Sequence, residues 1–233
     1  TVLSRGLGDV YKRQHEVITE ALHLLRPEWP IVSEEGSSGG DPLDSDYSFL
    51  VDPLDGTTNL IHGLPVFCVS VALVDGHQPV VAIVYDPNRD ECFTAWQGGG
   101  THLNGKPVCC ANRSQLSDAL VATGFPHWDF DRMDDYLEAL TAYARGSRGI
   151  RRMGSAAIDL AYVACGRFDL FFEYSLQPWD IAAGLLLVQE AGGITCTFSG
   201  QDDTEAMLSG AETFAAAPGI AKEGLAVIRS AFG

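Results

Sequence analysis

The stretch VDPLDGTTNL, residues 51–60, ends an apolar segment with two aspartates and then turns into a run of small polar residues. Asp52 and Asp55 are three positions apart, and Pro53 stiffens the chain between them. A turn here can bring both carboxylates and the Leu54 carbonyl toward one point, and oxygen ligands of this kind suit Mg²⁺. For these ten residues alone, an Asx turn with a threonine helix cap is an equally good interpretation.

The residues after Asp55 predict a phosphate site beside the cation site. Gly56 frees the backbone to turn. The segment Thr57–Asn59 can cap a helix whose first N–H groups point outward. Such N–H groups attract phosphate oxygens. The stretch therefore offers a place for a cation and, next to it, a place for an anion.

Two further acidic residues strengthen this interpretation. Glu34 in SEEG lies at the end of an apolar strand, and Asp180 in QPWDIAAG lies at the start of a helix. Taken singly, they read as a solvated loop glutamate and an N-cap aspartate. With Asp52 and Asp55 they make four carboxylates at the ends of elements, as a phosphate-transfer site with two or three Mg²⁺ ions needs. These motifs contain no Lys or Arg, so metal ions are needed to draw in a phosphate dianion.

The composition narrows the class of partner. The 233 residues carry 15 Lys and Arg against 31 Asp and Glu, a net charge of −16. This balance argues against nucleic acid and anionic membranes as partners, because both attract clustered basic residues. The six cysteines include no C-x-x-C pair and predict buried thiols in a reducing compartment, hence a cytoplasmic protein.

The apolar patterns predict two halves that pack as one unit. Residues 15–145 combine apolar strands with amphipathic helices and form an antiparallel α+β half that carries the metal site. Residues 146–233 alternate helices with strands and form a smaller α/β half that completes the site. The helices are expected over residues 15–28, 131–145, 155–166, 179–193 and 225–232.

Three segments carry a family resemblance. SEEG at 33–36, VDPLDGTTN at 51–59 and QPWDIAAGLLLVQEAGG at 177–193 resemble, in this order, the signatures of the inositol monophosphatase family. The likeness extends from about residue 15 to the C-terminus. It implies a layered αβαβα sandwich of the α+β / α/β class, a homodimer, and lithium-sensitive, Mg²⁺-dependent hydrolysis of small phosphate monoesters.

The resemblance also implies roles for individual positions. The implied metal ligands, for two or three Mg²⁺ ions, are Glu34, Asp52, the Leu54 carbonyl, Asp55 and Asp180. The implied catalytic residues are Glu34, Asp55 and Thr57. The implied substrate-binding residues are Gly56, Thr57, Gly154, Ser155, Ala156, Glu173 and Asp180. Thr57 would help to orient the attacking water, and Glu173 would accept hydrogen bonds from substrate hydroxyl groups.

Two regions are expected to lie outside the site. The first 14 residues, TVLSRGLGDVYKRQ, do not resemble the family, whose members carry an upstream helix and an Asp that partners the equivalent of Thr57. We expect residues 1–14 to be a non-native or disordered leader on an N-terminally truncated chain. The arginines of RGSRGIRRM, residues 145–153, are expected at a surface or interface rather than at a phosphate.

The sequence thus predicts a phosphomonoesterase for myo-inositol monophosphate or a similar small polyol phosphate. Fructose 1,6-bisphosphate, histidinol phosphate and 3′-phosphoadenosine nucleotides are the alternative substrates within the same fold. Thr58-Asn59 resembles the monoesterase branch rather than the nucleotide phosphatases. A weakly active regulatory dimer is the alternative from another class of function, because Thr57 finds no matching upstream Asp in this sequence.

Overall fold

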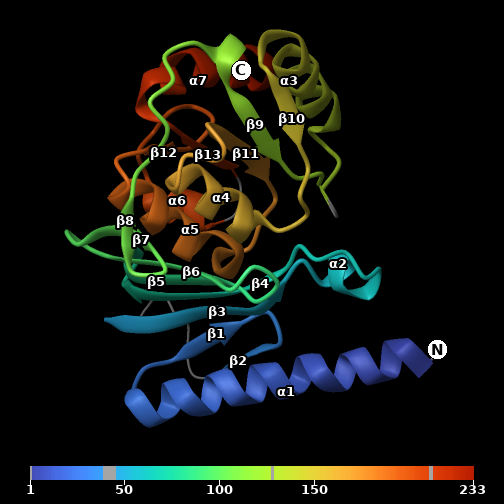
Figure 1. Cartoon of the computed structure of the whole chain (residues 1–233), viewed down its shortest axis with the longest axis vertical. Coiled ribbons are helices and arrows are strands. Elements are labelled where there is room, and N and C mark those ends of the chain that lie inside the picture. The colour runs from blue at the N-terminus through green and yellow to red at the C-terminus, as the bar shows by residue number, and fades with distance from the viewer. Residues whose placement is uncertain (1, 39–45, 127–128, 210–211) are drawn as a thin grey trace.

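The computed structural model describes residues 2–38, 46–126, 129–209 and 212–233, without the side chains of 2–11, 37 and 38. Figure 1 shows five layers. They run from helix α1 through an eight-stranded sheet, a central layer of helices and a five-stranded sheet to the helices α3 and α7. This arrangement confirms the predicted αβαβα sandwich.

The first sheet is mostly antiparallel, and one parallel pair brings two acidic segments together. Its strands lie in the order β2-β1-β3-β4-β5-β6-β7-β8. β1 is parallel to β3 with Ser33 opposite Val51. The next residues, Glu34 and Asp52, therefore lie at the same edge of the sheet. The strands are β1 (Ile31–Ser33), β2 (Gly36–Ser38), β3 (Tyr47–Asp55), β4 (Cys68–Asp75), β5 (Gln78–Asp86), β6 (Glu91–Trp96), β7 (Gly100–Leu103) and β8 (Lys106–Val108).

The second sheet begins earlier in the chain than the predicted boundary. Its order is β10-β9-β11-β13-β12, and β9 is parallel to both of its neighbours. Strand β9 and helix α3 (Met133–Gly146) therefore belong with this sheet, although β9 and all but the last residue of α3 precede residue 146. An apolar pattern predicts a strand but not which sheet the strand joins, so the sequence could not place them. The strands are β9 (Leu120–Thr123), β10 (Gly149–Arg151), β11 (Leu170–Tyr174), β12 (Ile194–Cys196) and β13 (Glu212–Ala216).

Helices α4 (Ala156–Ala164) and α5 (Pro178–Glu190) lie between the two sheets (Figure 1). All nine residues of α4 are buried, as are those from Ile181 to Val188 in α5. A helix that is covered on every side needs no polar face, which explains why both segments are almost entirely apolar. One continuous core joins these helices to both sheets. The remaining helices are α2 (Thr57–Ile61), α6 (Thr204–Leu208) and α7 (Pro218–Phe232), with a 3-10 turn at Leu116–Asp118.

Helix α1 (Val2–Leu25) packs against β3 on the outer face of the first sheet. It includes most of the helix predicted over 15–28 but begins much earlier, within the segment that was expected to be disordered. That segment contains no proline, and Leu3, Leu7 and Val10 recur at helical spacing, so a helix can continue through it. Among the described residues, no helix has both the length and the apolar content required to cross a membrane.

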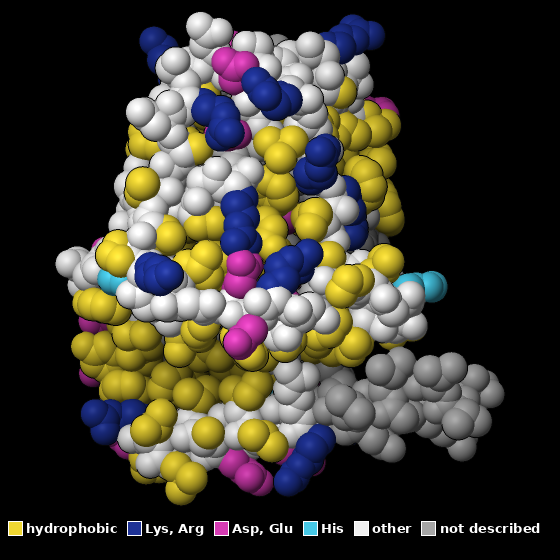
Figure 2. All heavy atoms as spheres, viewed as in Figure 1, with side chains coloured by type: hydrophobic (Ala, Val, Ile, Leu, Met, Phe, Trp, Pro, Cys, Tyr) yellow, Lys and Arg dark blue, Asp and Glu magenta, His cyan; other side chains and the backbone are white. Residues whose placement is uncertain are grey.

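Apolar side chains remain exposed on the first sheet. Val81 and Ile83 of β5 and Trp96 of β6 are 39%, 38% and 50% exposed. Figure 2 shows hydrophobic side chains gathered on the left of the view, just above α1. The Trp96 ring stacks on His102 with the ring centroids 5.2 Å apart, which shields part of its surface. This face is therefore less completely covered than the inner face, which packs against α4 and α5.

We predict that Gly184→Ala destabilises the fold, because α4 and α5 approach each other closely at this residue. A Cβ on Gly184 would lie 2.4 Å from Leu160 Cδ1 and 2.5 Å from Leu160 Cβ. Overpacking of this kind costs about 1–3 kcal/mol. Urea unfolding should show a lower midpoint for the variant.

Gly146→Ala is the matched control, since Gly146 ends α3 and the nearest atom to its Cβ would be Leu116 Cδ2 at 4.0 Å. That change should be neutral or slightly stabilising. Equal midpoints for the two variants would contradict the close-contact argument.

Candidate active site

Every residue that the sequence assigned to a site lines one pocket of about 420 Å³. The pocket lies where the end of β3 meets α2 and the first turns of α4 and α5. The predicted residues in its lining are Glu34, Asp52, Leu54, Asp55, Gly56, Thr57, Gly154, Ser155, Ala156, Glu173 and Asp180. The lining also includes Thr58, which the sequence placed only in the helix cap, and it includes Gly124, Arg152, Asp159 and Leu176, to which the sequence assigned no place in the site.

A bulge in β3 turns its two aspartates to the same side. Asp52 pairs with Ser70 of β4. Asp55 pairs with Cys68, so three steps along β3 match two steps along β4. In a regular strand, residues three apart would point to opposite faces. The extra residue restores the same side, and Pro53 is tolerated because a bulge leaves one N–H out of the ladder.

The Asp55 carboxylate is held by the start of α4. Its Oδ2 accepts hydrogen bonds from the Ser155 hydroxyl at 2.7 Å and from the Ala157 backbone N–H at 2.8 Å. Ser155 is also the N-cap of α4, and its Oγ accepts from the Ile158 N–H at 3.3 Å. Ser155 therefore orients a carboxylate of the first sheet, a role that the sequence did not predict.

Backbone N–H groups orient two other carboxylates of the pocket. The Leu54 N–H donates to Asp52 Oδ1 at 2.8 Å, within the bulge. The Gln177 N–H donates to Asp180 Oδ2 at 2.8 Å, so this side chain folds back over the first turn of α5. Pro178 occupies the start of α5, where its missing N–H leaves no helical bond unmade. The chain therefore fixes these side chains by itself.

The start of α2 differs from the predicted threonine cap. Gly56 is the N-cap, and no side chain caps this helix. The Thr57 hydroxyl instead donates to the Leu54 carbonyl at 3.0 Å, which closes the turn after Asp55. Gly56 has a φ of +97°, and a Cβ there would lie 2.7 Å from the Val66 carbonyl oxygen. Glycine is therefore required at this position.

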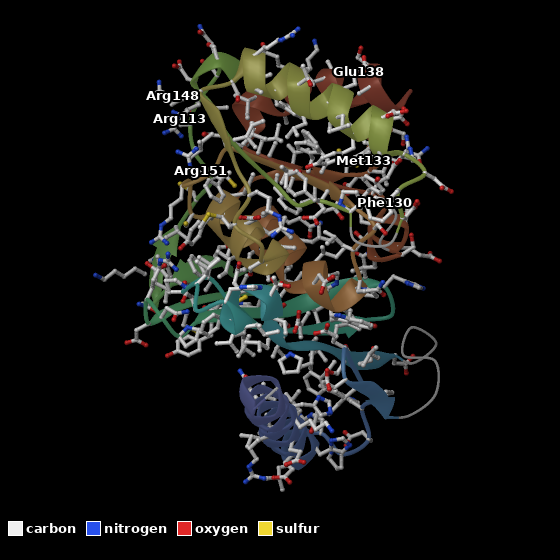
Figure 3. The ribbon with its side chains drawn as sticks, turned by 90° about the vertical axis from the view of Figure 1, so that its right-hand side faces the viewer. Arg113, Phe130, Met133, Glu138, Arg148 and Arg151 are labelled. Carbon is white, nitrogen blue, oxygen red and sulfur yellow. The ribbon has the colours of Figure 1, made fainter. Side chains whose placement is uncertain are left out.

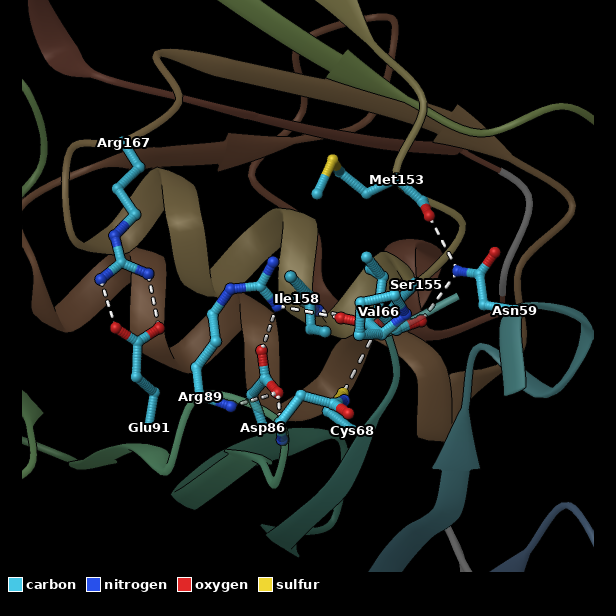
Figure 4. A network of polar contacts seen from close by, with 12 residues as sticks. Asn59, Val66, Cys68, Asp86, Arg89, Glu91, Met153, Ser155, Ile158 and Arg167 are labelled. Atoms are coloured by element: carbon cyan, nitrogen blue, oxygen red, sulfur yellow. Dashed lines mark hydrogen bonds and ion pairs between the residues drawn. The ribbon is translucent and has the colours of Figure 1, made fainter. Parts of the chain in front are cut away.

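Asn59 joins two segments of the pocket that are far apart in the sequence. Its Nδ2 donates to the carbonyls of Val66 at 2.8 Å and Met153 at 2.9 Å. Figure 4 shows Asn59 reaching from α2 to the Met153 segment, close to Ser155. The sequence predicted only a capping role for Asn59, because nothing in VDPLDGTTN indicates a partner near residue 153.

The second sheet contributes Glu173 of β11, and Gly124 makes room for it. Glu173 is 6% exposed and accepts a hydrogen bond from the Gly124 backbone. A Cβ on Gly124 would lie 1.9 Å from Glu173 Oε1. Any other residue at position 124 would therefore displace the carboxylate. Gly124 directly follows β9, which explains why the placement of β9 in the second sheet matters for the site.

Arg152 lines the pocket, which corrects the expectation that the arginines of residues 145–153 all lie at a surface or interface. Its guanidinium lies 5.5 Å from the centroid of the Phe125 ring. Arg148 does lie at the surface and pairs with Asp118 at 2.9 Å. Figure 3 shows Arg148 and Arg151 at one edge of the second sheet. Successive side chains of an extended segment alternate in direction, so Arg151 and Arg152 face different surroundings.

The sequence of this chain is similar, along most of its length, to known proteins. Residues 7–231 match the sequence profile of the Inositol monophosphatase family. The chain belongs to the inositol monophosphatase family. It is 43% identical over 195 residues to the Nus factor SuhB of Xylella fastidiosa, with 84% of this chain and 70% of that protein covered. It is 46% identical over 182 residues to the Inositol-1-monophosphatase of Rhizobium meliloti, with coverages of 78% and 68%.

The fold agrees with a solved structure of the same family. The native structure of the extragenic suppressor protein suhB from Bartonella henselae superposes with a TM-score of 0.88 at 36% identity, covering 97% of this chain and 92% of that one. The family is generally metal-dependent and acts on small phosphorylated substrates. The chain is accordingly a phosphatase of the phosphoric monoester hydrolase class.

The donor set of the pocket suits a hard divalent cation. Among the described residues, no three His, Cys, Asp or Glu side chains are close enough together to hold a metal ion. The pocket nevertheless gathers four carboxylates and a carbonyl, the oxygen ligands that Mg²⁺ prefers.

Burial raises the pKa values of Asp52, Asp55, Asp180 and Glu173 in the pocket. It is the largest cause of the raised pKa of Asp55, to about 6, and of Asp180, to about 7. Burial, followed by the charges of Asp55 and Asp180, also raises the pKa of Asp52. Burial raises the pKa of Glu173 to about 8, against the opposing effect of Arg152. A cation in the pocket would favour the charged forms.

We predict that the metal-free protein becomes more stable as the pH falls from about 8 toward 5. Unfolded carboxyl groups titrate near pH 4, whereas Asp55, Asp180 and Glu173 titrate at about 6, 7 and 8 in the folded protein. Between these values the folded protein binds more protons than the unfolded chain, so the free energy of unfolding falls as the pH rises. Thermal melting in EDTA should give a higher Tm at pH 6 than at pH 8.

Two further measurements check the cause. Asp52→Asn should raise the Tm of the metal-free protein at pH 8, because it removes one repelling charge. Millimolar Mg²⁺ should raise the Tm more at pH 8 than at pH 6, since it binds the charged carboxylates of the folded state. A Tm in EDTA that is constant or lower at pH 6 would show that the acidic pocket does not limit stability.

Proposed function

We propose that this chain hydrolyses the phosphate monoester of a small polyol, myo-inositol monophosphate or a close analogue, with the aid of Mg²⁺. The observation that carries the proposal is one pocket that joins the carboxylates of β3 and α5 to Glu173 of the second sheet. The carboxylates of β3 and α5 suit cations that bind phosphate, and the Glu173 carboxylate suits a hydroxyl group that donates a hydrogen bond. The relative named Inositol-1-monophosphatase supports the same class of substrate.

The pocket residues would hold two or three Mg²⁺ ions. The proposed ligands are Glu34, Asp52, the Leu54 carbonyl, Asp55 and Asp180. When bound, Mg²⁺ supplies positive charge that offsets the charge of the phosphate and promotes ionisation of water. The chain supplies orientation: Ser155 and the α4 backbone hold Asp55, and the Gln177 N–H holds Asp180. The backbone of Gly56 and Thr57 is the proposed contact for the phosphate oxygens.

Thr57 is the residue that we propose orients the attacking water. Its hydroxyl hydrogen is directed to the Leu54 carbonyl, so its oxygen is left as an acceptor. We infer that a water donates one hydrogen bond to Thr57 Oγ1 and another to the carboxylate of Glu34 or Asp55. In this position the water directs a lone pair toward phosphorus. Hydrolysis then breaks the bond between phosphorus and the ester oxygen, and the polyol leaves with a proton. No covalent bond to the chain is formed.

The substrate assignment is tested by phosphate release across a panel. The panel contains myo-inositol 1-phosphate, glycerol 2-phosphate, fructose 1,6-bisphosphate, histidinol phosphate and a 3′-phosphoadenosine nucleotide, each with millimolar Mg²⁺ and with excess EDTA. The proposal expects the polyol monophosphates to give the highest kcat/KM. A preference for the nucleotide, or full turnover in EDTA, would count against it.

Three further properties are proposed: a homodimer, from the family resemblance; a cytoplasmic location, from the cysteine pattern; and inhibition by lithium at a Mg²⁺ position, again from the resemblance. Analytical ultracentrifugation tests the first. Phosphate release in the presence of LiCl, with NaCl as the control for ionic strength, tests the last. Insensitivity to lithium would count against the proposed inhibition but not against the proposed Mg²⁺ ligands.

The relatives named Nus factor SuhB favour a second candidate, a regulatory protein in which hydrolysis is weak. In that case a surface for a partner, rather than the pocket, would carry the function. Asp55→Asn separates the two candidates, because a regulatory function would survive a substitution that stops hydrolysis.

We predict that Asp55→Asn lowers kcat by about 100-fold or more while the fold is retained. The amide removes an anionic ligand, and charge stabilisation by metal ions usually supplies effects of this size. Phosphate release measures the activity, and circular dichroism confirms the fold. Asp134→Asn, on the exposed first turn of α3, is the matched control and should leave kcat unchanged. A kcat for Asp55→Asn within tenfold of the wild-type value would show that Asp55 is not a metal ligand.

A further inference from the structure

One buried carboxyl group in the pocket has no role in the chemistry proposed above. Asp159 lies in α4, one turn after Ser155, whose carbonyl accepts from the Asp159 N–H at 3.0 Å. Asp159 is one of the residues that line the pocket, and it is 1% exposed. Among the described residues, Asp159 Oδ1 has no hydrogen-bond partner. A buried polar atom without a partner destabilises a fold, so its presence at a pocket points to a ligand.

The neighbours of Asp159 define the kind of group that would bind there. Among the charges that act on it, Glu173 has the largest effect and Arg152 opposes it. The two carboxyl groups disfavour an anion, Arg152 disfavours a cation, and an unpartnered polar atom disfavours an apolar group. A neutral hydroxyl group fits, because it donates to a carboxylate and accepts from a protonated carboxyl group.

A purely structural role accounts for Asp159 less well. An acidic residue in the first turn of a helix is favoured by the helix dipole, and Asp159 occupies that turn of α4. This interaction requires neither burial nor a place in the pocket lining. The Asp55 carboxylate moreover already accepts the Ala157 N–H at the same helix end.

We propose that Asp159 forms a hydrogen bond with a hydroxyl group of the substrate, beside the hydroxyl bound by Glu173. This inference deepens the proposed function and rests on it. The pair would select an ester whose alcohol carries neighbouring hydroxyl groups over one whose alcohol is apolar or cationic. Asp159 is a specificity residue, because it would bind the alcohol part of the ester while the phosphate lies at the carboxylates of β3 and α5.

The test combines a variant with substrates that lack single hydroxyl groups. kcat/KM is measured for the wild type and Asp159→Ala with myo-inositol 1-phosphate, with each of its monodeoxy analogues, and with phenyl phosphate. The variant should lose about 10- to 100-fold on the full substrate, as expected for a hydrogen bond to a charged group. The loss should be at least tenfold smaller on phenyl phosphate and on the one analogue that lacks the hydroxyl bound by Asp159.

Thr213→Val is the matched control. Thr213 Oγ1 is also buried and has no partner in the described part of the chain, and Thr213 lies opposite Glu173 in the sheet but does not line the pocket. Its removal should affect all the esters alike. If Asp159→Ala does not fold, Asp159→Asn keeps the size and one acceptor oxygen, and it should show the same pattern with smaller losses.

Two results would overturn the assignment: an equal loss on every ester, or no loss on myo-inositol 1-phosphate. The activity of the wild type on these esters tests the proposed function separately. If it hydrolyses phenyl phosphate but no polyol phosphate, the proposed function fails, and the inference fails with it before any variant is compared.

Discussion

The hydrogen bonds from Ser155 and the Ala157 N–H to the Asp55 carboxylate set the arrangement of the pocket. They join a strand of the first sheet to a helix of the central layer across a separation of 100 residues. Two donors at a helix N-terminus are among the stronger partners that a carboxylate can find. They partly offset the burial that raises the pKa of Asp55. Once α4 is fixed in this way, α5 is fixed as well, because the two helices meet closely at Gly184.

The pocket concentrates acidic groups that the rest of the fold must tolerate. Asp159 and Glu173 add to the four carboxylates assigned to metal, while Arg152 is the basic residue in the described lining. The core that joins both sheets to α4 and α5 supplies the stability that makes this arrangement possible. Functional sites often contain such unfavourable interactions, because binding a ligand rather than folding relieves them.

Much of the site could be predicted from the sequence, because its motifs combine residue type with spacing. Asp52 and Asp55 were predicted to meet, and the bulge explains how residues three apart can do so. Asp159 was missed because a single acid within SAAIDLAYVACG does not alter the apolar pattern of a buried helix. The role of Asn59 was missed for another reason, since its partner Met153 becomes a neighbour only when the two sheets come together.

The order in which the chain is made affects when its acidic groups meet. Glu34, in the turn after β1, and Asp52 and Asp55, in β3, are synthesised early in the chain. Asp180 comes more than a hundred residues later, at the start of α5. Repulsion between the two sets therefore arises only in the step that brings α5 between the two sheets. Divalent cations that bind these carboxylates would favour that step, because they offset the repulsion.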